Sequence, residues 1–97
     1  MNIETLIKER KATIIDVRTR EEFSSGNAEG SINIPLQEIQ ENLDKLLSFR
    51  QPLVLCCASG NRSNQACQYL SKVGFDCYNG GSWMSVNFYQ SLNEKSC

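Results

Sequence analysis

The sequence contains no histidine, and this absence excludes several common catalytic sites. A serine–histidine–aspartate triad and a cysteine–histidine dyad both need an imidazole as general base. Zinc sites often combine cysteine with histidine, and the five cysteines, at positions 56, 57, 67, 77 and 97, include no C-x2-C pair. We therefore expect no bound metal and a chemistry that proceeds without histidine.

Long apolar runs and basic clusters are also missing. No stretch approaches the roughly 20 apolar residues of a membrane-spanning helix. The N-terminus, MNIETLIKERK, lacks the basic segment and apolar run of a signal peptide. Lys and Arg number 10 and Asp and Glu 11, which gives a formal net charge of −1. We therefore expect neither nucleic acid nor a membrane as partner, and a cytoplasmic location.

The cysteine count predicts thiols rather than a disulfide framework. Five cysteines cannot all pair within one chain. Without a signal peptide, a reducing compartment is the expected setting. We expect Cys67 and Cys77 to be core residues, and Cys97 to belong to an exposed tail.

The pattern of apolar residues predicts one α/β domain over residues 1–97. No repeat or Pro/Gly/Ser-rich linker divides the chain. Apolar, β-branched runs predict strands over 13–17, 31–34, 53–56 and 75–78. Helical spacing predicts helices over 3–9, between 35 and 49, over 66–73 and after 83, and we expect a turn at Gly80–Gly81. This alternation predicts a mostly parallel sheet of about four or five strands with helices on both faces.

The segment CCASGNRS, residues 56–63, joins a predicted strand to a predicted helix. At such a junction, unpaired backbone N–H groups and the positive end of the helix dipole can converge on an anion. Gly60 permits a left-handed backbone conformation there. A helix N-terminus and a nearby cation lower the pKa of a thiol, and Arg62 is the nearby cation. The segment therefore predicts a nucleophilic cysteine in an anion-binding loop.

Two cysteines compete for this role. Counted from Cys56, the segment has the C-x5-R spacing of cysteine phosphatases; counted from Cys57, the loop is one residue shorter. The apolar run 53–55 carries Cys56 into the strand and leaves Cys57 at its end. The residue before Cys56 is Leu55, where such phosphatases usually have histidine. These features favour Cys57.

At this point the sequence resembles the rhodanese-like sulfurtransferase family. The first matching motif is the loop Cys57-Ala58-Ser59-Gly60-Asn61-Arg62-Ser63. The second comprises Asp16-Val17-Arg18, Glu22-Phe23, Gly26, Gly30 and Ile32-Asn33-Ile34-Pro35, and the third is Gly80-Gly81 followed by Trp83. The chain departs from the family at Asn27 and Ala28, where histidine and isoleucine are frequent, and at Ala58, where a larger side chain is frequent.

The resemblance implies that Cys57 takes a sulfane sulfur from thiosulfate or a persulfide and passes it to a thiol, cyanide or a protein sulfur carrier. The implied roles are Cys57 as nucleophile, the backbone N–H groups of 58–63 as a cradle and Arg62 as an anion anchor. No cofactor is implied beyond the persulfide on Cys57. Arg18 is either a framework partner of Asp16 that reaches Glu22, or a substrate contact. The alternatives are a phosphatase or arsenate reductase that uses Cys56, and a catalytically inactive binding module.

Overall fold

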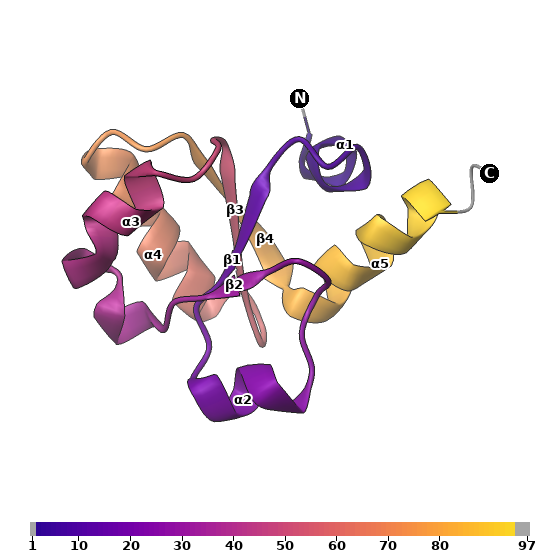
Figure 1. Ribbon diagram of the computed structural model, residues 1–97, viewed down its shortest axis with the longest axis horizontal. Coiled ribbons are helices and arrows are strands. Elements are labelled where there is room, and N and C mark those ends of the chain that lie inside the picture. Colours follow the sequence, from indigo (N-terminus) through magenta and orange to yellow (C-terminus); the bar gives the residue numbers. More distant parts are fainter. Residues whose placement is uncertain (1, 95–97) are drawn as a thin grey trace.

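The computed structural model, which describes residues 2–94, has a central sheet of four parallel strands (Figure 1). In chain order the strands are β1 (Thr13–Asp16), β2 (Ile32–Asn33), β3 (Leu53–Cys57) and β4 (Cys77–Ser82), and their spatial order is β2-β1-β3-β4. The prediction of an α/β fold with a parallel sheet is therefore confirmed.

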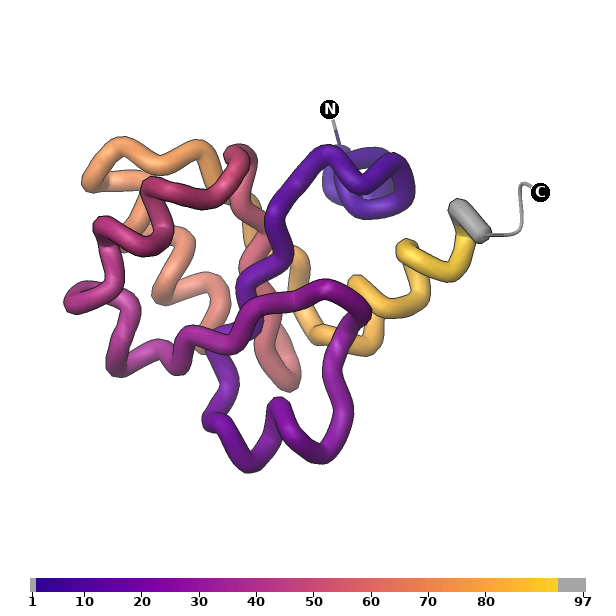
Figure 2. The backbone as a smooth tube through the Cα atoms, in the orientation of Figure 1, coloured from indigo at the N-terminus to yellow at the C-terminus, as the bar shows by residue number. Residues whose placement is uncertain are grey.

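Helices cover both faces of this sheet (Figures 1 and 2). One face carries α1 (Ile3–Lys8) and α5 (Trp83–Glu94). The other carries the 3-10 turns η1 (Leu36–Glu38) and η2 (Gln40–Asn42) together with α3 (Leu43–Leu47) and α4 (Asn61–Lys72). A further short helix, α2 (Arg20–Ser25), lies near the end of the sheet where β1 and β3 finish. Within residues 2–94 no helix combines the length and the apolar character needed to cross a membrane.

Strand β3 divides the core into two clusters. All five of its residues are buried, as expected for a central parallel strand. Because side chains alternate along a strand, Leu53, Leu55 and Cys57 face the cluster beneath α3 and α4. Val54 and Cys56 face the cluster beneath α1 and α5. The two adjacent cysteines therefore lie on opposite faces of the sheet.

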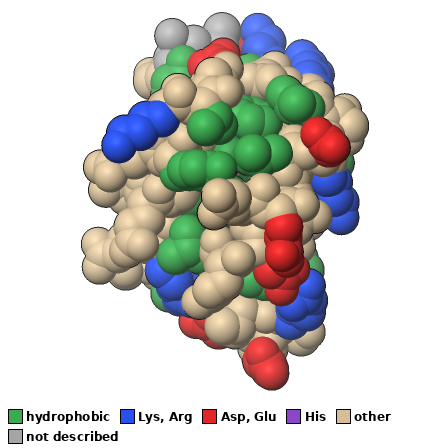
Figure 3. Space-filling view, turned by 90° about the vertical axis from the view of Figure 1, so that its left-hand side faces the viewer, with side chains coloured by type: hydrophobic (Ala, Val, Ile, Leu, Met, Phe, Trp, Pro, Cys, Tyr) green, Lys and Arg blue, Asp and Glu red, His purple; other side chains and the backbone are tan. Residues whose placement is uncertain are grey.

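The continuous helix predicted between 35 and 49 was wrong in one respect, because the segment is broken into η1, η2 and α3. The break comes at Asn42, whose φ and ψ are −114° and 23° and whose side-chain amide donates to the carbonyl of Glu38 at 2.8 Å. Such side-chain bonds compete with the helical ladder. Ile39 and Leu46 are buried, but Leu47 is 60 % exposed. Figure 3 shows hydrophobic side chains gathered on one face of the molecule.

The last strand also differs from the prediction. It spans Cys77–Ser82 rather than 75–78, and the expected turn at Gly80–Gly81 is part of it. Leu55 pairs with Asn79 and Cys56 with Gly81, so Gly80 is the extra residue of a β-bulge. A Cβ on Gly80 would lie 2.7 Å from Val54 Cγ1 and 3.2 Å from Val86 Cγ2. Glycine is therefore needed here for close packing within a strand.

Candidate active site

The sulfur of Cys57 is surrounded by backbone N–H groups at the junction of β3 and α4. β3 ends at Cys57 and α4 begins at Asn61, and between them Gly60 has a φ of +101° that favours glycine. The N–H of Gly60 donates to Cys57 Sγ at 2.9 Å, and the N–H of Ser63 donates to it at 3.4 Å. Of the predicted cradle of N–H groups over 58–63, those of Gly60 and Ser63 therefore point at Cys57 Sγ.

This environment changes the acidity of Cys57. Burial alone raises the pKa of the Cys57 thiol, because it disfavours the charged form. Hydrogen bonds from the Ser63 hydroxyl and from the backbone N–H groups of Ser63, Gly60 and Ser59 outweigh burial, so the net pKa lies below the ordinary value. The residue is nevertheless fully buried in this conformation. The geometry thus favours a thiolate that is covered by its own loop.

Asn79, a residue that sequence reasoning missed, supports this loop from β4. Its side-chain amide donates to the carbonyl of Gly60 at 3.1 Å, and its Oδ1 accepts from the Ser63 hydroxyl at 2.6 Å. Oδ1 also accepts from the N–H of Gly81 at 3.0 Å. The Ser63 hydroxyl also lies 3.2 Å from the carbonyl oxygen of Gly60 and 3.4 Å from Cys57 Sγ. Its single proton therefore has three acceptors within reach, of which Asn79 Oδ1 is the nearest. The position of Asn79 directly before Gly80–Gly81 was the one signal in the sequence that could have drawn attention to it.

Cys56 occupies a different environment. It lies in the cluster beneath α1 and α5, with no exposed surface. Burial, followed by the nearby carboxylate of Asp16, raises the pKa of Cys56 to about 12. A thiol with this pKa is almost entirely protonated near neutral pH and is a poor nucleophile. The structure therefore disfavours the alternative hypothesis in which Cys56 is the nucleophile.

Arg62 is not placed as predicted. Its guanidinium pairs with the carboxylate of Glu22 on α2, with Nη1–Oε1 and Nη2–Oε2 distances of 2.7 and 3.0 Å. No hydrogen bond joins this side chain to Cys57 within residues 2–94 of the structure, and the pKa of Cys57 is lowered by Ser63 and the amides instead. The fold thus uses Arg62 to tie the first turn of α4 to α2.

Glu22 gives this ion pair a pH dependence. The hydrogen bond from Arg62, with one from the backbone of Thr19, lowers the pKa of Glu22 to about 2. A pKa depressed by folding stabilises the protein above the unfolded-state value of about 4.3, and this contribution disappears as the pH falls toward 2. Because the pair is partly exposed, we expect about 0.5–1 kcal/mol at neutral pH.

The substitution Glu22→Gln tests this contribution. Glutamine keeps one oxygen that can accept from the Thr19 N–H in the capping box. It removes the charge and replaces one of the two oxygens that accept from Arg62 by an amide nitrogen. We expect the variant to unfold at lower urea concentration than the native protein at pH 7, with the difference vanishing between about pH 4 and pH 2. A difference that stays constant over this range would show that Arg62 does not stabilise the folded state through the charge of Glu22.

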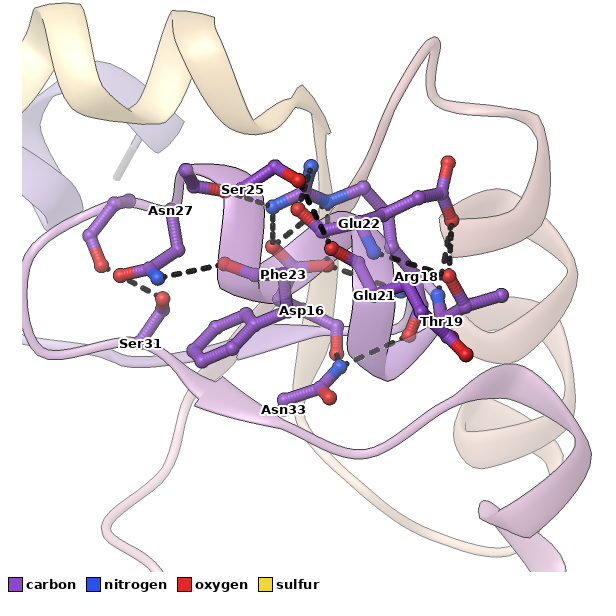
Figure 4. A network of polar contacts seen from close by, with 12 residues as sticks. Asp16, Arg18, Thr19, Glu21, Glu22, Phe23, Ser25, Asn27, Ser31 and Asn33 are labelled. Carbon is purple, nitrogen blue, oxygen red and sulfur yellow. Dashed lines mark hydrogen bonds and ion pairs between the residues drawn. The ribbon is translucent and has the colours of Figure 1, made fainter.

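Arg18 is held in a buried network at the end of β1 (Figure 4). Its Nε and Nη2 atoms donate to the carboxylate of Asp16 at 3.0 and 2.8 Å. Nη2 also donates to the carbonyl of Gly26 at 2.6 Å, and Nη1 to the backbone carbonyl of Glu22 at 3.3 Å. The ring of Trp83 lies 4.9 Å from the guanidinium. These contacts favour the framework interpretation over a substrate contact, although Arg18 reaches the backbone of Glu22 rather than its carboxylate.

The remaining predicted loop residues lie at the surface of the cradle. Ala58, Ser59 and Asn61 are exposed, so their side chains face solvent while their backbone forms the loop. Within residues 2–94 no three potential metal ligands are grouped together. Cys97, predicted to belong to an exposed tail, lies outside the described residues.

Comparisons with known proteins match this fold and loop. The model of the family described as rhodanese-like domain matches residues 2–85. A putative mitochondrial thiosulfate sulfurtransferase of Schizosaccharomyces pombe is 32 % identical over an alignment of 90 residues that covers 78 % of this chain and 63 % of the relative. The thiosulfate sulfurtransferase PspE of Escherichia coli is 36 % identical over 62 residues, which are 63 % of this chain and 60 % of the relative.

The solved structures agree. A structure described as rhodanese with anions from E. coli has a TM-score of 0.70 and 30 % identity, and covers 76 % of this chain and 89 % of that one. The chain spans just under two thirds of the length of these two curated relatives, and about half the length of a third, the Bacillus subtilis protein YqhL. The match of the family model to most of the chain, together with the shared fold, shows that the protein belongs to the family of rhodanese-like domains.

Proposed function

We propose that the protein is a sulfurtransferase that carries sulfane sulfur as a persulfide on Cys57. The observation on which this rests is the pair of N–H groups, from Gly60 and Ser63, that point at Cys57 Sγ from 2.9 and 3.4 Å. They stabilise a thiolate, and the same amides can stabilise the anionic end of a persulfide. The relatives described as thiosulfate sulfurtransferases and the structure described as containing anions support the same reading.

The reaction has two steps. In the first step the Cys57 thiolate attacks the outer sulfur of a donor. With thiosulfate, a sulfur–sulfur bond forms between Cys57 and this outer sulfur, the sulfur–sulfur bond of thiosulfate breaks, and sulfite leaves with the electron pair of the broken bond. In the second step an acceptor attacks the terminal sulfur and the Cys57 thiolate is released. Cyanide leaves as thiocyanate, and a thiolate leaves as a persulfide. A sulfur carrier protein can serve as the acceptor in the same way. Neither step needs a general base or a further cofactor.

Access to the sulfur requires the loop to move. Cys57 is fully buried, whereas Ala58 and Ser59 beside it are exposed. The hydrogen bonds that Asn79 makes to Gly60 and Ser63 therefore hold the closed form. A donor small enough to enter after a slight opening of 58–60 suits this geometry better than a bulky one.

Intact-mass spectrometry after incubation with thiosulfate, and separately with an inorganic polysulfide, tests the proposal. We expect a gain of about 32 Da, one sulfur, that cyanide removes again. With thiosulfate as donor, Cys57→Ser should lose this gain completely. Cys56→Ser is the matched control, because it changes the same atom in the neighbouring residue on the opposite face of the sheet, and it should retain the gain.

Two results would overturn the proposal. Sulfur loading that survives Cys57→Ser but is lost in Cys56→Ser would show that Cys56, and not Cys57, carries the sulfur. Absence of loading with both donors, together with a Cys57 thiol that titrates like a free one, would favour a binding module without activity.

A further inference from the structure

Two pairs of side chains connect α4 to β4. The first is the hydrogen bond between Ser63 and Asn79 beside the nucleophile. The second is formed by Cys67 and Cys77, whose sulfur atoms lie 3.3 Å apart. Cys67 follows Ser63 by four residues on α4, and Cys77 precedes Asn79 by two on β4. Residues four apart lie on one face of a helix, and residues two apart lie on one face of a strand. The two pairs are therefore neighbours.

The distance between the two sulfurs is short for thiols that are not bonded. A disulfide bond is about 2.05 Å long, so closing it needs only a small further approach. Both cysteines are partly exposed, and both are free in the structure. Cys77 Sγ also lies 3.3 Å from the hydroxyl of Ser71, which is itself exposed. A reagent in solution can therefore reach the pair without unfolding the core.

We propose that Cys67 and Cys77 form a redox site, a dithiol that closes to an intramolecular disulfide and fixes α4 against β4. The oxidant is a low-molecular-weight disulfide. One protein thiolate attacks a sulfur of this reagent, forms a mixed disulfide and releases one thiolate. The second protein thiolate then attacks the protein sulfur of the mixed disulfide and releases the other. Two protein thiols are oxidised and one external disulfide is reduced. The two protons lost by the protein thiols pass through water to the two released thiolates, which become thiols.

The closeness of the two sulfurs lets either thiol complete the reaction. Burial, and the contact with Cys77, raise the pKa of Cys67, so the pair reacts faster as the pH rises. Whichever thiol attacks first, the other lies 3.3 Å away and can resolve the mixed disulfide. The site does not involve Cys57 and does not depend on the proposed sulfur transfer.

The test uses the Cys57→Ser/Cys97→Ser protein, incubated with oxidised glutathione. We expect a mass about 2 Da below that of the reduced protein, from the loss of two hydrogens. Trypsin cleaves after Arg62 and Lys72, so Cys67 and Cys77 fall in separate peptides, and Cys56 in a third. The peptide of residues 63–72 should be found linked to the one that begins at Val73, and reduction should separate them.

Single substitutions in the same background separate this site from accidental oxidation. Cys67→Ser and Cys77→Ser should each stop at a mixed disulfide of glutathione on the remaining cysteine of the pair, and neither should show the loss of about 2 Da. The oxidised protein should also have a higher Tm than the reduced one, a rise that both substitutions abolish. Stable glutathione adducts without a 67–77 link would overturn the redox site, and an unchanged Tm would overturn the claim that the bond fixes α4 against β4.

Discussion

Replacing Arg18 with leucine should lower the free energy of unfolding by about 3–5 kcal/mol, because it leaves a buried carboxylate without its partner. Asp16 is 0 % exposed and Arg18 only 4 %. The guanidinium contacts both carboxylate oxygens and caps the carbonyls of Gly26 and Glu22 as well. The whole free energy of unfolding of a small domain is roughly 5–15 kcal/mol, so the variant should lose a large share of its stability.

Arg20→Leu is the matched control for this prediction. Arg20 forms an ion pair with both carboxylate oxygens of Glu38, at 2.7 Å each, but its side chain is 67 % exposed. Water already solvates both charges there, so we expect a much smaller loss of stability than for Arg18→Leu. Urea unfolding followed by circular dichroism measures both variants. Equal shifts of the unfolding midpoint would contradict the view that burial of Asp16 makes Arg18 essential.

The order of strands and helices could be predicted from the sequence because most of it depends on local patterns. The runs that became β1 and β3 are apolar on both faces, which only a strand covered by helices on both sides accommodates. The stripe that became α4 repeats at helical spacing and ends before Gly74, whose φ is +103°. The helix α2 was not predicted, although the Thr19 to Glu22 capping box marks its start.

The elements that were misassigned are those decided by distant contacts. Gly80 and Gly81 are typical of a turn in isolation. In the fold, Gly80 passes against Val54 and Val86, so the pair forms a bulge in a strand. These neighbours are 26 residues before and 6 residues after Gly80, and no local pattern reveals that they meet.

The candidate site shows the same division between features set by local sequence and features set by distant contacts. The cradle at Cys57 belongs to one short segment, and its strand, glycine and helix start could all be predicted from eight residues. The partner of Arg62 could not, because Glu22 is 40 residues away in the chain and comes near only through the crossover of β1 and α2. Asn79 is likewise placed beside Gly60 by the pairing of β3 with β4.

Gly60→Ala should slow the reaction of Cys57 at neutral pH by about tenfold or more, because it disturbs the closest donor to the sulfur. At a φ of +101° a side chain is strained, and the added Cβ would lie 3.3 Å from the backbone Cα of Gly81. The backbone must shift to relieve this contact, and the N–H that now lies 2.9 Å from Cys57 Sγ shifts with it. The pKa of Cys57 should rise, which the pH dependence of iodoacetamide alkylation measures.

Gly74→Ala separates the loss of the donor from the strain of the substitution. Gly74 has nearly the same φ, +103°, but no atom lies within 4 Å of its added Cβ, and it lies at the far end of α4 from the cradle. Both variants should therefore lose about 1–2 kcal/mol of stability through backbone strain alone. Only Gly60→Ala should also change the alkylation profile and the rate of sulfur loading. If Gly74→Ala slows Cys57 equally, the amide of Gly60 has no special part in holding the thiolate, and general destabilisation explains both results.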